Sequence, residues 1–311
     1  MSNNCALALL SPDFPALRGV KLPPMTTPLL LVDAPYLLYR AFYGLPDKIR
    51  GADKKPVNAL LGSVNTILAQ AEERNARAVV CCFGPDAARY RVGLYPDYHA
   101  HRPPMPADLA HQWEIAPKLY EALGWIVETS DELEADDLLG ALAGAEEAAG
   151  GEALILTGDR DLFQCTTESV QVLLLGGRGK KGPEEIGPVE VQERYGVTPE
   201  QVPDFIALRG DPSDGLPGAK GIGEKRAAEI LRRDGSLAAA LEIAEADGPE
   251  VNALARQADL LRAFHDIASL RPVDVDRPSD TPTDYAMGAV AARTIGMNRL
   301  ADRLEKAADE A

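Results

Sequence analysis

The sequence predicts an α/β protein with a mostly parallel sheet, flanking helices and a smaller helical subdomain. Short apolar runs alternate with helix-like segments in the first part of the chain, and neighbouring parallel strands need such helical crossovers. From Val197 onward the pattern becomes purely helical. The length of 311 residues and the hydrophobic fraction of 46% allow one substantial core and one helical appendage.

Each expected strand is a short, mainly apolar run. The run at 29–32 is continuously apolar and ends on Asp33, which is typical of a buried parallel strand. The other expected strands lie at 78–83, 125–128, 153–156 and 170–174. Together they predict a sheet whose strands are separated by helical crossovers.

Helical spacing of apolar residues marks the connections. The stretch 57–74 carries its apolar residues on one stripe, as a crossover helix does. The other expected helices lie at 36–44, at 110–123, from the acidic cluster to 149, and at 226–233, 251–270 and 289–310. The proline-rich residues 1–27 are expected to form a flexible leader, and residues 272–311 a C-terminal extension that packs on the body.

Acidic residues gather where the expected strands end. In open parallel sheets, ligands bind outside the carboxyl ends of the strands. Six carboxylates fall at or just beyond such ends: Asp33, Glu134, Asp136, Asp137, Asp159 and Asp161. A helix N-terminus, which favours acidic residues, is the alternative interpretation for the cluster at 134–137. It does not account for acids that are far apart in sequence but share one sheet edge.

Two other segments have features of nucleic-acid contacts. Basic and aromatic residues interleave between Arg89 and Arg102, a composition that suits phosphates and stacked bases. A solvated loop is the alternative for that segment. Gly221-Ile222-Gly223 lies between two expected helices, and its glycines and the following helix N-terminus suit close approach of a phosphate. The neighbouring Lys220, Lys225 and Arg226 strengthen that interpretation.

Charge and cysteine content narrow the function classes. The formal net charge of -16 argues against a diffuse polyanion-binding surface, so any nucleic-acid contact is expected to be local. The four cysteines show no zinc-ligand spacing and are typical of the reducing cytoplasm. No twenty-residue apolar span is present, so neither secretion nor a membrane span is expected.

Several segments, in this order, resemble the bacterial 5′-3′ exonucleases and flap endonucleases, including the 5′ nuclease domain of DNA polymerase I. The matching segments are Leu30-Leu31-Val32-Asp33 with Tyr39-Arg40, residues 98–102, Leu133-Glu134-Ala135-Asp136-Asp137, residues 157–162, residues 210–218 and residues 221–225. They cover about residues 28 to 275. The combination is far more specific than any one of these motifs.

The resemblance implies a PIN-like nuclease domain at 28–196, with an arch segment at about 84–110, and a helix-hairpin-helix subdomain at 197–271. It implies a hydrolase that cuts DNA phosphodiesters near 5′ ends in replication or repair. The implied substrate is DNA with a 5′ flap, a nick or a single/double-strand junction. The residues that would hold the duplex are Lys220, Gly221, Ile222, Gly223, Lys225 and Arg226, and a monovalent cation such as K⁺ would bind at the hairpin carbonyls.

The resemblance also implies two metal positions. Asp33, Glu134, Asp136 and Asp137 correspond to ligands of one ion, and Asp159, Asp161, Asp211 and Asp214 to ligands of a second. Two Mg²⁺ or Mn²⁺ ions can activate water and stabilise the leaving oxygen of an in-line displacement, and hard oxygen ligands suit these ions. Arg40, Arg91 and Arg102 are candidate phosphate clamps because of their forked donors. Tyr39 is a candidate stacking platform for a terminal base.

Two positions depart from the family pattern. Gly84 stands where a metal-binding Asp is usual, with Asp86 as the nearest acid, and His99 stands where the arch usually carries Lys. If these changes weaken catalysis, Gly84→Asp with His99→Lys should raise the rate. A branched-DNA-binding module with weak or no catalysis is therefore an alternative function. A PIN-type ribonuclease is a further alternative, although it would not need the hairpin.

Overall fold

The computed structural model describes residues 27–176, 182–249 and 252–310. The expected leader lies, except for Thr27, outside the described residues. In the described part of the chain no helix is long and apolar enough to cross a membrane.

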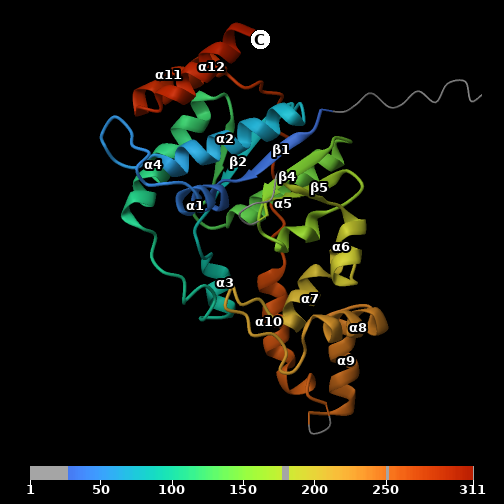
Figure 1. The fold of residues 1–311 in the computed structure, drawn as a ribbon. Coiled ribbons are helices and arrows are strands. Elements are labelled where there is room, and N and C mark those ends of the chain that lie inside the picture. Colours follow the sequence, from blue (N-terminus) through green and yellow to red (C-terminus); the bar gives the residue numbers. More distant parts are fainter. Residues whose placement is uncertain (1–26, 177–181, 250–251, 311) are drawn as a thin grey trace, which may run out of the picture.

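A six-stranded sheet forms the centre of the first part of the chain (Figure 1). Its strands are β1 (Leu29–Asp33), β2 (Ala78–Phe83), β3 (Ile126–Thr129), β4 (Ala153–Thr157), β5 (Val170–Leu174) and β6 (Glu184–Ile186). They are ordered β3-β2-β1-β4-β5-β6; β1 to β5 are parallel and β6 is antiparallel to β5. The predicted fold class is confirmed. The three-residue β6 was not predicted because Glu184 and Glu185 interrupt any apolar run.

The strand order reverses between β1 and β4. From β1 the chain builds outward through β2 and β3, then crosses back so that β4 pairs with the other side of β1. The carboxyl ends of β1 and β4 therefore flank the switch point at which doubly wound sheets form their binding crevice. Asp33 ends β1 and Thr157 ends β4.

Successive strand residues point to opposite faces of the sheet, and each face has its own core. Leu29, Leu31 and Val80 pack toward α5 (Ala135–Ala148) and the helical part of the chain. Leu30, Val32 and Val79 pack toward the helices α1 (Ala34–Gly44), α2 (Asn58–Glu73) and α4 (Ala107–Ala122). The sheet is thus buried on both sides, which accounts for its continuously apolar strands.

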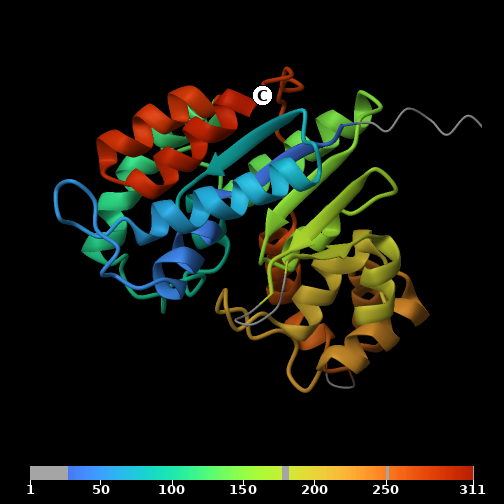
Figure 2. The same ribbon diagram turned by 45° about the horizontal axis from the view of Figure 1, so that its top comes forward.

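The helices of the second part form a lobe below the sheet (Figures 1 and 2). They are α6 (Pro188–Tyr195), α7 (Val202–Arg209), α8 (Glu224–Asp234), α9 (Leu237–Asp247) and α10 (Ala258–Ala268). The helix predicted at 251–270 is shorter than expected, because it begins at Ala258 after a 3₁₀ turn at Ala255–Gln257. Between β2 and α4, the short α3 (Arg89–Leu94) was not predicted and contacts α10.

The last segment of the chain packs on the far side of the sheet domain. The single helix predicted at 289–310 is two helices, α11 (Tyr285–Ile295) and α12 (Asn298–Glu310). Gly296 breaks them with a φ of 93°, a left-handed conformation that glycine adopts readily. Both helices lie at the end of the molecule opposite to α8 and α9 (Figure 1).

Candidate active site

Asp33 and Thr157 connect the two strand ends at the switch point. The Thr157 hydroxyl donates a 2.6 Å hydrogen bond to Asp33 Oδ2, and the Tyr36 backbone N–H donates to Asp33 Oδ1 at 3.0 Å. Thr157 Oγ1 also accepts the backbone N–H of Asp159 at 2.9 Å. The backbone after β4 is therefore held beside the end of β1. Thr157 begins the matching segment 157–162, but the sequence does not predict its hydrogen bond to the distant Asp33.

Four carboxylates near the Asp33–Thr157 hydrogen bond interact electrostatically: those of Asp33, Asp136, Asp159 and Asp161. Burial raises the pKa of Asp33, although the bonds from Thr157 and Tyr36 oppose the shift. Burial, with repulsion from Asp159 and Asp33, raises the pKa of Asp136 well above its usual value. Burial also raises the pKa of Asp159 to about 6. Burial, with repulsion from Asp159, raises the pKa of Asp161 well above its usual value. The cluster is short of positive charge.

The lack of neighbouring positive charge is clearest at Asp136 and Asp161. Asp136 lies in the first turn of α5, and Asp161 begins the 3₁₀ helix Asp161–Cys165 after β4. Neither carboxylate accepts a hydrogen bond or forms an ion pair with any described residue. Both side chains are partly exposed rather than sealed in the core. They can therefore accept a cation that enters from solvent.

Asp211 and Asp214 reach the cluster from the helical lobe. They sit in a tight loop in which the backbones of Asp211 and Leu216 exchange two hydrogen bonds of 2.8 Å. Gly210 has a φ of 84°, and a Cβ there would lie 2.7 Å from the Leu216 carbonyl oxygen, so the loop requires glycine. Both aspartates contribute to the raised pKa values of Asp159 and Asp161.

The chemistry of this donor set fits a hard divalent cation. Asp33, Asp136, Asp159, Asp161, Asp211 and Asp214 offer only carboxylate oxygens, the ligands that Mg²⁺ and Mn²⁺ prefer. Within the described residues, however, no three His, Cys, Asp or Glu side chains are arranged to hold one ion. The carboxylates form an open array across two lobes rather than a closed cage. Cations would have to draw them together.

Glu134 and Asp137, predicted as metal ligands, accept hydrogen bonds from protein donors. Glu134 Oε1 accepts the Ala88 N–H at 2.6 Å, and Oε2 accepts the Tyr98 hydroxyl at 2.9 Å. Asp137 is fully buried and caps α5 by accepting the Glu134 N–H. Each carboxylate also pairs with Arg91. Both residues therefore cap the N-terminus of α5, as the helix-N-terminus interpretation expects, and their role toward a metal stays a prediction.

Arg91, predicted as a phosphate clamp, is a buried structural residue. Its side chain is 3% exposed and lies 2.9 Å from both Glu134 Oε2 and Asp137 Oδ1. Its Nε donates to the Ile267 carbonyl oxygen of α10 at 2.9 Å. Arg91 therefore joins α3, α5 and the helical lobe, and no forked donor remains for DNA. The sequence does not predict this structural role of Arg91, because Glu134, Asp137 and Ile267 are distant from it in the chain.

Of the other candidate clamps, Arg40 and Arg102 are nearer the surface, whereas the His99 side chain is buried. Arg40 is exposed and donates to the Gly176 carbonyl oxygen at 3.4 Å. Arg102 is partly exposed and donates to Asp86 at 2.9 Å and to Asp214 at 3.2 Å. His99 is 5% exposed and lies 3.0 Å from Asp214 through Nε2. Of these side chains, only Arg40 lacks a carboxylate partner among the described residues.

Gly84 cannot accommodate the aspartate that the family pattern suggests. A Cβ at Gly84 would lie 2.4 Å from the Leu133 carbonyl oxygen and 2.7 Å from the Ala135 nitrogen. These are backbone atoms of the segment leading into α5, so they cannot move aside cheaply. The carboxylate of Asp86, the nearest acid, is exposed and pairs with Arg102 at 2.9 Å, so a role of Asp86 in metal binding stays a prediction.

The predicted duplex contacts are exposed on the helical lobe. Lys220, Lys225 and Arg226 are all exposed, while Ile222 packs partly into the core. A Cβ at Gly221 or Gly223 would meet nothing within 4 Å, so the backbone is open to an approaching phosphate. On the sheet domain, Tyr39 is half-buried. Its ring and that of Trp113 are nearly perpendicular, with centroids 6.3 Å apart, and this contact limits the part of the Tyr39 ring on which a base can stack.

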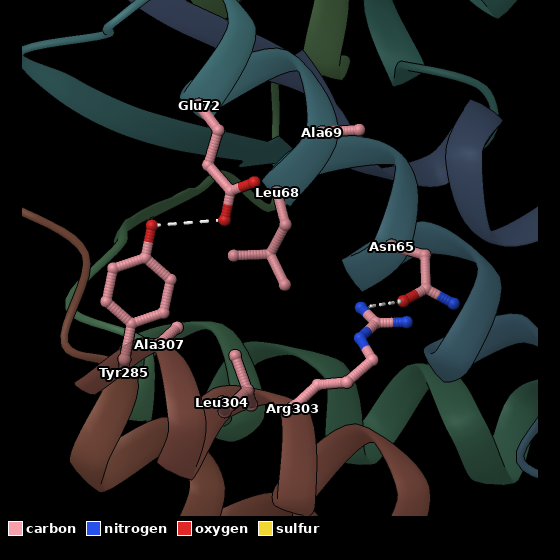
Figure 3. A pocket seen from close by; sticks show the side chains of 8 residues that line it. All are labelled: Asn65, Leu68, Ala69, Glu72, Tyr285, Arg303, Leu304 and Ala307. Atoms are coloured by element: carbon pink, nitrogen blue, oxygen red, sulfur yellow. Dashed lines mark hydrogen bonds between the residues drawn. The ribbon is translucent and has the colours of Figure 1, made fainter. Parts of the chain in front are cut away.

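Two hollows lie away from the carboxylates' centre. One, of about 160 Å³, separates α2 from α11 and α12 and is closed by Tyr285–Glu72 and Arg303–Asn65 hydrogen bonds (Figure 3). It belongs to the packing of the C-terminal helices. The other, of about 320 Å³, lies beside Gly84 and Trp113 at the carboxyl ends of β2 and β3. Of the two hollows, only the second lies at the carboxyl edge of the sheet.

Two family models match the chain in succession. The 5′-3′ exonuclease N-terminal resolvase-like domain matches residues 28–196, and the 5′-3′ exonuclease C-terminal SAM fold matches residues 197–287. A protein of Mycobacterium tuberculosis named 5′-3′ exonuclease is 33% identical, covering 92% of this chain and 99% of the relative. The thermostable DNA polymerase I of Thermus filiformis is 37% identical over 89% of this chain but only 32% of the polymerase.

Solved structures agree in fold. The T5 5′-exonuclease with bound zinc ions has a TM-score of 0.62 at 20% identity, covering 91% of this chain and 98% of that one. The catalytic core of Rad2 in complex with DNA substrate has a TM-score of 0.60 at 15% identity, covering 90% and 92%. The order of motifs, the carboxylate-lined switch point and both family models lead to one conclusion: the chain belongs to the 5′-3′ exonuclease family of DNA nucleases.

Proposed function

We propose that this nuclease hydrolyses DNA phosphodiesters near 5′ ends at single/double-strand junctions, with Mg²⁺ or Mn²⁺ held by the open carboxylate array. The observation that carries the proposal is the pair Asp136 and Asp161, which are partly exposed acids with raised pKa values and no hydrogen-bond donor among the described residues. Uncompensated carboxylates at a switch point are costly unless a cation binds there. The T5 relative with bound divalent ions supports the same interpretation.

The proposed ligands divide between the lobes. Asp33, Asp136, Asp159 and Asp161 belong to the sheet domain, and Asp211 and Asp214 to the helical lobe. When bound, divalent ions supply activation of a water nucleophile and charge stabilisation at the leaving oxygen. The chain itself supplies Thr157, which fixes one oxygen of Asp33, and Arg40, which is exposed and able to bind a substrate phosphate.

Residues 197–271 are proposed to hold the duplex through Gly221, Gly223, Lys220, Lys225 and Arg226. The open backbone at both glycines and the N-terminus of α8 support phosphate binding. A monovalent cation such as K⁺ at the hairpin carbonyls is part of this proposal. The described cysteines, Cys81, Cys82 and Cys165, are all free thiols, which supports a cytoplasmic location.

A cleavage assay tests the function. A 5′-flap duplex, a nicked duplex and the single strand alone are incubated with Mg²⁺, Mn²⁺ or EDTA, and product lengths are measured. We expect metal-dependent cutting near the junction, lowered at least about 100-fold by Asp161→Asn. The matched control is Asp131→Asn, which alters an exposed acid in the loop before α5 and should leave the rate unchanged.

The alternatives give different results. Flap binding without cleavage in either metal would support the branched-DNA-binding module. One observation favours that alternative: Gly84 carries no carboxylate, and Glu134 and Asp137 already accept hydrogen bonds from protein donors. Faster cutting of an RNA version of the same substrate would support a PIN-type ribonuclease.

A further inference from the structure

The arch segment rests on the loop that carries Asp214. The His99 backbone N–H donates to the Asp214 carbonyl oxygen at 3.1 Å. Gly215, with a φ of 77°, brings its backbone so close that a Cβ would lie 2.9 Å from the Asp97 carbonyl oxygen. This contact joins a segment of the sheet domain to the helical lobe beside a proposed metal ligand.

The His99 side chain is fixed on three sides. Nε2 lies 3.0 Å from Asp214 Oδ1, and Nδ1 contacts the backbone carbonyl oxygen of Asp86. The ring stacks on Tyr98 with centroids 3.9 Å apart and an interplanar angle of 18°. Tyr98 is in turn anchored to Glu134. With only 5% of its side chain exposed, His99 is poorly placed to reach a phosphate.

Arg102 contacts the same oxygen of Asp214. Its Nη2 lies 3.2 Å from Asp214 Oδ1, while Nη1 lies 2.9 Å from Asp86 Oδ1. Both donors thus converge on Oδ1, and no described residue bonds to Oδ2. The carboxylate has one oxygen held by the arch segment and one oxygen free for a cation.

We propose that His99 and Arg102 are positioning residues for Asp214: they hold Oδ1 so that Oδ2 binds the cation. This inference rests on the proposed metal-dependent function. Carboxylates that bind metals are commonly oriented by hydrogen bonds from neighbouring groups, and losing such a bond typically costs about 10- to 100-fold in metal affinity or activity. His99 therefore acts through Asp214, whereas a lysine at this position would supply a mobile point charge.

Two separate readouts test the proposal. Mn²⁺ binding to the DNA-free protein is titrated by electron paramagnetic resonance, and binding of a fluorescent 5′-flap duplex is measured in EDTA. His99→Asn is the first variant, because Asn tolerates the left-handed φ of 55° but is too short to keep both contacts. Arg102→Gln is the second, since its partly exposed side chain does not contribute to the core.

His111→Gln is the matched control. His111 also pairs with an aspartate, Asp53 at 2.9 Å, but lies on α4 away from the carboxylate array. We expect His99→Asn to weaken Mn²⁺ binding about tenfold while DNA affinity in EDTA stays within about twofold. Arg102→Gln should also weaken Mn²⁺ binding, and His111→Gln should not. Circular dichroism confirms that each variant is folded.

Unchanged Mn²⁺ affinity in folded His99→Asn overturns the proposal, and accompanying loss of DNA affinity would assign His99 to phosphate binding instead. If His99→Asn does not fold, Arg102→Gln tests the proposal. Unchanged Mn²⁺ affinity in Arg102→Gln would then overturn it. Failure of the wild-type protein to bind Mn²⁺ would overturn the metal-dependent function as well. The wild-type measurement therefore separates the two failures.

Discussion

Arg91 and Asp137 form a buried ion pair of 2.9 Å that fixes the acidic end of α5 to α3. The same guanidinium pairs with Glu134 and donates to the Ile267 carbonyl oxygen in α10. The α5 N-terminus also carries Asp136, whose carboxylate accepts no hydrogen bond from any described residue. Arg91 thus fixes the backbone around the site through Glu134 and Asp137, while Asp136 forms no ion pair with any described residue.

Replacing Arg91 by Met should be strongly destabilising. The substitution leaves Glu134 and Asp137 buried without their cation, and breaking such a pair typically costs about 3–5 kcal/mol. Urea unfolding monitored by circular dichroism measures the free energy of unfolding. Arg293→Met is the matched control, because Arg293 also pairs with two carboxylates but is 42% exposed, so its loss should cost under about 1 kcal/mol. Equal losses in the two variants would refute the structural role of Arg91.

Gly84 gives a second prediction about the same segment. Gly84→Ala places a Cβ against the backbone of Leu133 and Ala135 and should lower the free energy of unfolding by about 1–3 kcal/mol. Gly144→Ala in α5, where a Cβ meets nothing within 4 Å, is the control and should stabilise by about 0.5–1 kcal/mol. If Gly84→Ala left the free energy of unfolding unchanged, the backbone of Leu133 and Ala135 would have moved aside for the new Cβ, which would contradict the prediction.

The contact at Gly84 also changes what Gly84→Asp is expected to do. Any side chain there displaces the backbone that carries Glu134 and Asp136. We therefore expect Gly84→Asp with His99→Lys to lower the nuclease rate rather than restore it. The sequence pattern alone suggested the opposite.

The fold was largely readable from the sequence because its signals are local. Apolar runs and helical spacing predicted five strands and most helices, and the strand ends correctly gathered Asp33, Asp136, Asp159 and Asp161 at one edge. The short β6 and α3 were missed because neither has enough residues to show a period. The break at Gly296 was missed because a single glycine does not by itself end a helical pattern.

The roles within the site were harder to predict, because they depend on contacts between distant segments. Glu134, Asp136 and Asp137 are nearly adjacent in sequence, yet two of them accept protein donors and one does not. What separates them is the position of Arg91, Tyr98 and Ala88, which follow a different strand. A motif identifies which acids gather, whereas only the packing shows which of them remain free.

The raised pKa of Asp159, about 6, predicts a pH dependence of stability in the metal-free protein. The unfolded chain loses this proton near pH 3.9, so between about pH 4 and 6 the folded state binds more protons, and stability falls as pH rises. This contribution is at most about 3 kcal/mol, because the side chain is partly exposed. In EDTA, Asp159→Asn should therefore gain stability relative to wild type between pH 4 and 7.

Thermal unfolding of both proteins across that pH range measures the difference. Asp131→Asn, at an exposed position, is the control and should track the wild type throughout. Mn²⁺ should reverse the trend in the wild type, because a bound cation stabilises the ionised carboxylates. A difference between Asp159→Asn and wild type that does not vary with pH would contradict the assigned pKa.

The hairpin lysines predict the salt dependence of DNA binding. If Lys220 and Lys225 each neutralise one phosphate, the double substitution to Ala should reduce the slope of log K against log salt by about 2, and each single one by about 1. Affinity for a 5′-flap duplex is measured in EDTA at several salt concentrations. Lys306→Ala on α12, at the opposite end of the molecule from α8, is the control and should leave the slope unchanged (Figure 1). A double variant with the wild-type slope would remove the hairpin from the DNA interface, because counterion release depends on the number of phosphates that are contacted.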